Sequence, residues 1–225
     1  MTIESAHPYP FDFEIKQTAL VLIDFQRDFL EPGGFGASLS NDVSLLRAAL
    51  GPARTLLDAA RRAGLLIIHT REGHRPDLVD MPPAKMRRGN PTLRIGDTGK
   101  LGRLLIRGEA GHGIVPELAP LAGEPIVDKP GKGAFYATDL ETLLQCRQIH
   151  SLLICGVTTE VCVHTTVREA NDRGYDGLLL VDCTESYFPA FKASAIQMIH
   201  AQGGIVGWTS SSAQLVDALT AIHAD

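Results

Sequence analysis

The sequence predicts one α/β domain over residues 1–225, a doubly wound three-layer (αβα) structure built on a six-stranded parallel sheet. Short runs rich in Val, Ile and Leu alternate with segments of helical periodicity along almost the whole chain, which is typical of strands and crossover helices. The composition, with 44% hydrophobic and 21% charged residues, suits a single globular domain. We find no internal repeat and no linker that would divide the chain.

The first half of the chain supplies two strands and one long connection. Thr18–Phe25 is predicted to be a buried strand, and Leu45–Ala63 a helix that Gly64 stops. Leu65–Thr70 is the second strand. Residues 71–113 interrupt the alternation of strands and helices, because they are rich in Gly, Pro and Arg and have little apolar periodicity. A connection this long inside a compact domain is usually functional or disordered, so we expect a functional loop.

The second half regains the alternation. Strands are predicted at Pro125–Lys129, Ile149–Val157, Leu178–Asp182 and Gly204–Thr209. Helices are predicted near Ile114–Leu121, from a capping box at Thr138–Glu141 to about Cys146, around Cys162 as far as Gly174, over Pro189–Gln202 and over Ser211–His223. Because parallel sheets bind ligands beyond the carboxyl ends of their strands, polar residues at those ends are the candidate site.

Three such residues form a chemically coherent group. Asp24 ends the first strand, Lys129 the third, and the fourth leads through Gly156 to Cys162, with Asp182 and Cys183 at the end of the fifth. Cys162 is predicted in the first turn of a helix, where free N–H groups and the helix dipole favour a thiolate. Asp would take the thiol proton and Lys would stabilise both anions. The N–H groups of Thr158 and Cys162 would form an oxyanion hole.

Each residue also has a simpler interpretation. Asp24 alone is equally consistent with a structural loop cap, and Cys162 with a small buried helix residue. Lys129 alone is more often a solvated loop lysine, and Lys132 competes with it for any role. The functional interpretation therefore depends on the three residues together.

Charge and cysteine content exclude several classes of function. The net charge is −5 and the pI about 5.9, so nothing indicates a nucleic-acid or anionic-membrane partner. No apolar run approaches the ~20 residues of a membrane span, and no signal peptide is visible at the N-terminus. The 4 cysteines have no CxxC spacing, which favours reduced thiols in a cytoplasmic enzyme.

At these residues the sequence resembles the isochorismatase-like (cysteine hydrolase) superfamily. The motifs that carry the resemblance are Leu22–Phe29, Asp128–Phe135, and Gly156–Cys162 followed by Arg168–Gly174. The resemblance implies a six-stranded doubly wound sheet, a homo-oligomer (a tetramer is favoured), and a catalytic triad of Asp24, Lys129 and Cys162. It also implies a cis peptide at Val157–Thr158 that turns the Thr158 N–H toward the oxyanion.

Two departures from relatives narrow the chemistry. Isochorismatase itself lacks the nucleophilic cysteine, so Cys162 indicates amide rather than vinyl-ether hydrolysis. Nicotinamidases carry a metal on an Asp-x-His motif, where this chain has Glu72 and His74 and no second His before His112. Two ligands make a poor metal site. We therefore expect no metal and no cofactor, and loop hydrogen bonding for Glu72 and His74.

The segments His69–Leu78 and Met198–Gly204 resemble the biuret and triuret hydrolase branch. Gln202 matches a substrate-binding glutamine of that branch, and an amide offers both a donor and an acceptor. Its simpler interpretation is a glutamine at a helix C-terminus that faces water. Four aromatic residues would wall a slot for a flat ureide: Phe25, Phe35, Tyr136 and Tyr187. Any one of them alone is more often a core residue. The predicted reaction is triuret to carboxybiuret, then biuret, plus ammonia, or biuret to allophanate plus ammonia.

Alternatives remain open at this point. Arginines of the long loop would either order it or bind a substrate carboxylate (Arg71, Arg75, Arg87 and Arg88). The second role favours an N-carbamoyl acid such as ureidoacrylate; N-carbamoylsarcosine and maleamate are further candidate substrates. A non-catalytic α/β binding protein with a redox-sensitive thiol is the alternative from another class.

Overall fold

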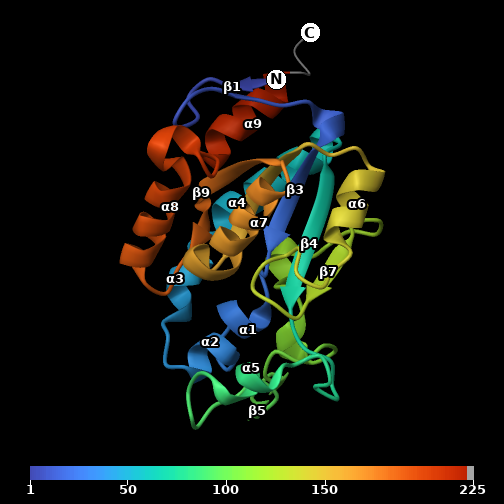
Figure 1. Cartoon of the computed structure of the whole chain (residues 1–225), viewed down its shortest axis with the longest axis vertical. Coiled ribbons are helices and arrows are strands. Elements are labelled where there is room, and N and C mark those ends of the chain that lie inside the picture. Colours follow the sequence, from blue (N-terminus) through green and yellow to red (C-terminus); the bar gives the residue numbers. More distant parts are fainter. Residues whose placement is uncertain (222–225) are drawn as a thin grey trace.

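A computed structural model describes residues 1–221 and contains the predicted six-stranded parallel sheet (Figure 1). Its strands are β3 (Thr18–Ile23), β4 (Leu66–Glu72), β7 (Ile126–Lys129), β8 (Ser151–Val157), β9 (Asp176–Glu185) and β10 (Trp208–Ser210). They lie in the order β10-β9-β8-β3-β4-β7, and every neighbouring pair is parallel. The chain winds outward from β3 through β4 to β7, then returns to β8 on the other side of β3. In parallel sheets ligands bind beyond the carboxyl ends of the strands at such a reversal, which here falls between β3 and β8.

Helices cover both faces of the sheet and complete the three layers (Figure 1). One face carries α3 (Val43–Arg47), α4 (Leu50–Ala63) and α9 (Ser212–Thr220). The other carries α6 (Leu140–Cys146), α7 (His164–Asp172) and α8 (Pro189–Gly204). Strand β3 is buried on both sides, because its side chains alternate between the two apolar clusters. The predicted fold class is therefore confirmed.

Short elements gather at the carboxyl edge of the sheet, where Figure 1 shows α1, α2, α5 and β5 below the ends of β3 and β4. They are α1 (Arg27–Leu30), α2 (Phe35–Ser38), α5 (Pro83–Arg87), β5 (Thr98–Gly99), β6 (Gly102–Arg103) and the 3₁₀ turn η2 (Ala110–His112). At the opposite edge lie β1 (Thr2–Ile3), β2 (Phe11–Asp12) and η1 (Ile15–Gln17). Within residues 1–221, no helix has the length and apolarity that crossing a membrane requires.

Prolines explain two differences from the predicted helices. The helix expected over 45–63 is two helices, α3 and α4, because Pro52 has no N–H to donate to Ala48. Gly64 ends α4 in the left-handed conformation, as predicted. The helix expected over 114–121 is only a 3₁₀ turn, η3 (Pro116–Leu118), because Pro120 cannot continue it.

The capping box predicted at Thr138–Glu141 is absent. Helix α6 begins after Asp139, the Thr138 hydroxyl donates to the Ala134 carbonyl at 2.6 Å, and the Glu141 carboxylate pairs with Arg173 at 3.3 Å. The Thr138 hydroxyl does accept from the Leu140 N–H at 3.3 Å, but Glu141 pairs with Arg173, so the reciprocal bond of a capping box is missing. The last predicted helix is α9, and its expected end at His223 lies outside the described residues.

Two further differences affect the site. Strand β4 continues to Glu72, beyond the predicted end at Thr70, so the long connection begins two residues later and contains α5, β5, β6 and η2. Cys162 lies in a π-helical turn, η4 (Thr159–Val163), and α7 begins only at His164. The cysteine is thus beside a helix start, but within a wider turn than predicted.

Candidate active site

Asp24 follows β3 directly and is completely buried. Its backbone has a positive φ of 53°, a conformation that Asp tolerates better than most residues. Its N–H donates to the Thr70 carbonyl at 3.2 Å, and the Thr70 hydroxyl donates to Asp24 Oδ1 at 2.6 Å. Strand β4 therefore fixes the direction of this carboxylate.

Lys129 ends β7, and its side chain is also completely buried. Its Nζ lies 2.7 Å from Asp24 Oδ2 and donates to the carbonyls of Gly131 at 3.0 Å and Lys132 at 2.9 Å. These contacts use all three ammonium protons. Burial lowers the pKa of Lys129, but the negative charges of Asp24, Cys162 and Glu72 raise it, and the net shift is upward. The lysine is therefore a fixed buried cation and not a solvated loop residue.

Cys162 lies beside this pair. Its sulfur, one carboxylate oxygen of Asp24 and one of Glu72 all lie within 4.8 Å of one another. Its thiol is buried and donates to Glu72 Oε2 at 3.5 Å. Burial raises the pKa of the thiol well above its usual value; Lys129 opposes this, while Asp24 and Glu72 add to it. The prediction that the helix start favours a thiolate is wrong for this state, because desolvation and two carboxylates outweigh the dipole. The thiol needs a base at the moment of attack.

The backbone around Thr158 has an unusual conformation. The Val157–Thr158 peptide bond is cis, as the resemblance implies. The Thr158 carbonyl accepts from the N–H groups of Val161 at 3.2 Å and Val163 at 3.3 Å, so the Cys162 N–H between them does not use that acceptor. Gly156 sits opposite Ile23 with φ of 136°, and a Cβ there would overlap the Ile23 carbonyl. Only glycine lets β8 approach β3 this closely.

Glu72 is the site residue that sequence reasoning missed. It is completely buried at the end of β4, directly opposite Lys129 in the β4–β7 register. The Gln26 amide fixes its backbone, accepting from the Glu72 N–H at 2.6 Å and donating to its carbonyl at 2.9 Å. Its Oε1 lies 2.7 Å from Lys132 Nζ and 3.5 Å from Lys85 Nζ. The expectation of loop hydrogen bonding is therefore wrong for Glu72.

The charge of Glu72 is set by its lysines. Burial raises the pKa of this carboxyl, but Lys132, Lys129 and Lys85 lower it more, to about 2. Glu72 is consequently an anion at neutral pH. His74 does have the expected loop role: its Nδ1 lies 3.2 Å from Asp80 Oδ1, and its Nε2 lies 2.8 Å from Lys85 Nζ.

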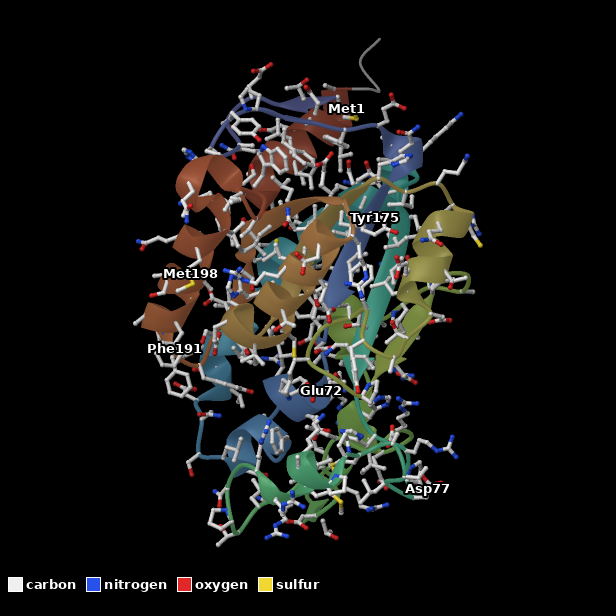
Figure 2. The ribbon with its side chains drawn as sticks, viewed as in Figure 1. Met1, Glu72, Asp77, Tyr175, Phe191 and Met198 are labelled. Atoms are coloured by element: carbon white, nitrogen blue, oxygen red, sulfur yellow. The ribbon has the colours of Figure 1, made fainter. Side chains whose placement is uncertain are left out.

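A cavity of about 740 Å³ lies next to this group. Its walls come mainly from the long connection, with Phe35 and Leu39 on one side and Pro130, Gly131, Lys132 and Tyr136 on the other. Lys85 and Lys132 both line it and bind Glu72, so the inner end of the cavity adjoins the buried acids. Figure 2 shows Glu72 between the central sheet and the short elements that form these walls.

Two of the four predicted aromatic residues line this cavity, Phe35 and Tyr136. Phe25 is instead 1% exposed in the apolar cluster under α4, so its ring is core. Tyr187 donates its hydroxyl to the Phe29 carbonyl at 2.7 Å and packs over Gly36, so it anchors the α1–α2 segment.

The structure places Gln202 away from the site. It is exposed at the end of α8, where the backbone turns left-handed with φ of 54°. Because α8 starts at the carboxyl edge and runs back along the sheet, its last turn lies at the opposite edge, near Pro8 (Figure 1). For this reason the prediction that Gln202 contacts the substrate is wrong for a site in the same chain.

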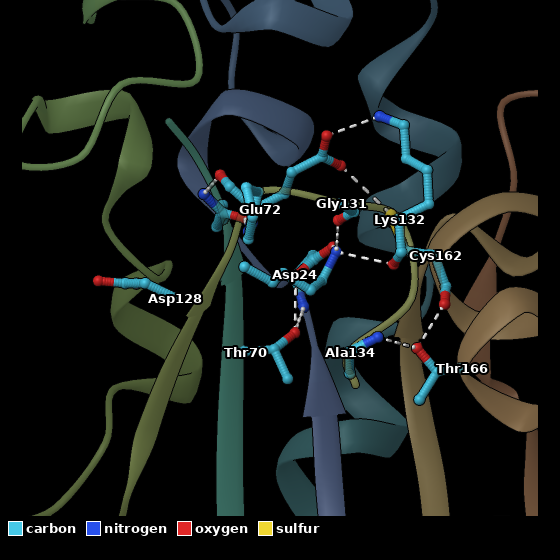
Figure 3. Close-up of polar contacts among 12 residues, drawn as sticks. Asp24, Thr70, Glu72, Asp128, Gly131, Lys132, Ala134, Cys162 and Thr166 are labelled. Carbon is cyan, nitrogen blue, oxygen red and sulfur yellow. Dashed lines mark hydrogen bonds and ion pairs between the residues drawn. The ribbon is translucent and has the colours of Figure 1, made fainter. Parts of the chain in front are cut away.

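The remaining polar strand ends have structural partners. Asp128 points away from the site in Figure 3 and pairs with Arg71 at 2.8 Å. Asp182 lies within β9 and accepts from the Ser212 N–H at 2.8 Å, at the start of α9. Arg75 pairs with Asp77 at 3.2 Å. Arg71 and Arg75 therefore order the chain, which is the first of the two roles predicted for these arginines.

The acids of the site do not form a suitable metal centre. Asp24, Glu72 and Cys162 supply three neighbouring ligand atoms, but the ammonium groups of Lys129 and Lys132 already bind the two carboxylates. The buried charges of the acids are therefore balanced by the chain's own lysines. The donor set leaves no uncompensated carboxylate for a cation.

Comparison with known proteins shows the family of this chain. Residues 18–211 match the isochorismatase domain, and the chain belongs to the isochorismatase family. A ureidoacrylate amidohydrolase, RutB, from Azorhizobium caulinodans is 30% identical over 219 residues, covering 92% of this chain and 92% of that protein.

Two solved structures show the same fold. A cysteine hydrolase from Pseudomonas syringae pv. phaseolicola is 24% identical with a TM-score of 0.80, covering 94% of this chain and 96% of that one. An N-carbamoylsarcosine amidase from Thermoplasma acidophilum is 22% identical with a TM-score of 0.65, covering 87% and 96%.

Proposed function

We propose that this chain is a cysteine-dependent amidohydrolase that cleaves the terminal C–N bond of a small ureide, triuret or biuret. The buried Asp24–Lys129 pair beside Cys162, at the reversal between β3 and β8, is the observation that carries the proposal. Supporting it are the resemblance of His69–Leu78 to ureide hydrolases and the cavity whose wall contains Lys85 and Lys132, the two lysines that bind Glu72.

The mechanism assigns one task to each group. Asp24 takes the Cys162 proton as the thiolate attacks the carbamoyl carbon, and Lys129 balances the negative charge that remains. The Thr158 and Cys162 N–H groups bind the oxyanion. The C–N bond then breaks, and Asp24 returns the proton to the departing ammonia.

The second half regenerates the enzyme. Water, deprotonated by Asp24, attacks the thioester carbon, and the sulfur leaves and takes back a proton. Triuret would give carboxybiuret, which loses carbon dioxide to form biuret; biuret would give allophanate. The high thiol pKa makes proton removal by Asp24 part of the attack rather than a preceding step.

A carbamoyl acid is the second candidate substrate. Arg88 and Arg94 line the cavity, and neither guanidinium makes an ion pair within residues 1–221. The similarity to a ureidoacrylate amidohydrolase points in the same direction. Two arginines facing a substrate carboxylate would suit ureidoacrylate better than a neutral ureide.

A substrate panel separates these functions. Ammonia release would be measured as kcat/KM for triuret, biuret, ureidoacrylate and maleamate, with Arg88→Gln and Arg94→Gln as matched variants. A ureide hydrolase should prefer triuret or biuret and be insensitive to both arginines. Preference for ureidoacrylate, lost in these variants, would establish the second candidate instead.

The nucleophile has its own control. Cys162→Ser and Cys162→Ala should remove ammonia release, whereas Cys146→Ser, at an exposed cysteine, should not. Retained turnover in Cys162→Ala would refute the mechanism. No turnover of any carbamoyl substrate by the unaltered protein would favour the non-catalytic binding protein.

A further inference from the structure

A second carboxylate faces the thiol and is not used by the mechanism above. Glu72 Oε2 lies 3.5 Å from Cys162 Sγ, while Oε1 is taken by Lys132 and Lys85. Asp24 differs, because Thr70 and Lys129 occupy its two oxygens. Among the described residues, the thiol is the one donor that reaches Glu72 Oε2. This oxygen is therefore an acceptor available to a bound substrate.

Glu72 is poorly suited to be the base. Its lysines hold its pKa at about 2, and the thiol has a pKa well above its usual value, so the proton would strongly prefer sulfur. A fixed anion of this kind is better suited to accepting a hydrogen bond. Gln26 and the β4–β7 pairing keep its backbone in place, which makes the acceptor rigid.

The attacked carbon carries three groups besides sulfur, and two have assigned places. The oxygen faces the Thr158 and Cys162 N–H groups, and the departing amine faces Asp24. The third group is the part of the substrate that remains in the thioester. An atom bonded to that carbon can come within hydrogen-bond distance of an oxygen that lies 3.5 Å from the sulfur.

We propose that Glu72 is a specificity-determining residue, which accepts a hydrogen bond from the retained N–H of the substrate, so that the site selects carbamoyl groups carried on a secondary nitrogen. This inference rests on the proposed function. Biuret, triuret and ureidoacrylate carry that N–H. N-carbamoylsarcosine has a methyl group there and maleamate has carbon, so both should be poor substrates.

The sharpest test uses substrates that differ by this one N–H. Ammonia release would be measured for biuret against 3-methylbiuret, and for N-carbamoylglycine against N-carbamoylsarcosine. The N–H member should be favoured by roughly 10⁴-fold in kcat/KM, the discrimination expected when a buried acceptor loses its donor. In Glu72→Gln the preference should fall at least about tenfold, because a neutral amide is a weaker acceptor.

Glu124→Gln provides the matched control. Glu124 is also a mostly buried carboxylate with a pKa of about 2, but it pairs with Arg61 at the other edge of the sheet. This variant should keep the full preference. An unchanged preference in Glu72→Gln, with turnover retained, would overturn the role of Glu72 and leave the proposed function intact. No ammonia from any of these substrates with the unaltered protein would instead refute the proposed function.

Thiol labelling shows whether each variant keeps the site folded. Glu72, Asp24, Lys129 and Lys132 face Cys162, and the Glu72 charge contributes to the high pKa of the thiol. Glu72→Gln should therefore shift the alkylation profile of Cys162 to lower pH, and Glu124→Gln should not. If Glu72→Gln does not fold, Glu72→Asp serves instead: it keeps the charge but withdraws the oxygen, and should also weaken the N–H preference. An undiminished preference in Glu72→Asp would count against the proposal.

Discussion

Each buried charge in this site is compensated by a neighbouring residue, and Lys129 is the residue on which most of this balance depends. Its ammonium binds the Asp24 carboxylate and two backbone carbonyls in a volume without solvent. Taking such charges out of water is costly, so the pair is stable only while both partners remain. The same arrangement holds a carboxylate oxygen next to a fixed cation and beside the thiol, where it can take the thiol proton during attack.

Lys129→Met should disable the enzyme and destabilise the fold. The buried Asp24 charge would lose its partner, which typically costs about 3–5 kcal/mol. Lys192→Met, which breaks a partly exposed pair with Glu185, should cost at most ~1 kcal/mol. Urea unfolding measures both. Adding Asp24→Asn to Lys129→Met should recover part of the loss; no recovery would mean that the uncompensated charge is not the cause.

At the scale of elements, a site residue could be predicted where the sequence of its own segment fixes its position. Asp24, Lys129 and Cys162 each follow a buried apolar run, so strand ends located them and the structure does bring them together. Glu72 owes its place to the β4–β7 register, a contact between distant segments that periodicity does not reveal. Gln202 failed for a related reason, because the direction of α8 decides which edge its last turn reaches.

The close approach of β8 to β3 makes Gly156 a test of how these elements form the site. Gly156→Ala should destabilise the protein by at least about 2 kcal/mol, because φ of 136° is unfavourable with a Cβ and the Cβ would overlap the Ile23 carbonyl. Gly51→Ala is the control: Gly51 lies in α4 with open space around its Cα, so alanine should stabilise by up to ~1 kcal/mol. Thermal unfolding compares them. A neutral Gly156→Ala would show that the strands separate at little cost.

At the scale of the whole molecule, an ionised carboxylate lies at each end of the β4–β7 strand pair. Glu72 lies at the carboxyl edge of β4 with Lys132, and Glu124 lies before β7 at the amino edge, 2.8 Å from Arg61 and 3.0 Å from His69. The pKa of each carboxyl is lowered to about 2. In both cases burial raises the pKa. Lys132, Lys129 and Lys85 lower the pKa of Glu72 by more, and Arg61, the Leu121 N–H and His69 lower that of Glu124 by more.

The lowered pKa values of these two carboxyl groups predict that the protein loses stability in acid. A carboxyl with a folded-state pKa near 2 and an unfolded value near 4.5 stabilises the fold fully above pH 4.5, and the contribution disappears as the pH falls toward 2. The free energy of unfolding, measured in urea, should therefore be flat between pH 6 and 8 with respect to these groups and fall steeply below about pH 4.5. Glu124→Gln should lower stability at pH 7 and make the acid decline shallower, since one of the two titrating groups is gone. Equal slopes for both proteins would show that Glu124 has the same pKa in the folded and unfolded states, so that its pairing with Arg61 does not lower this pKa.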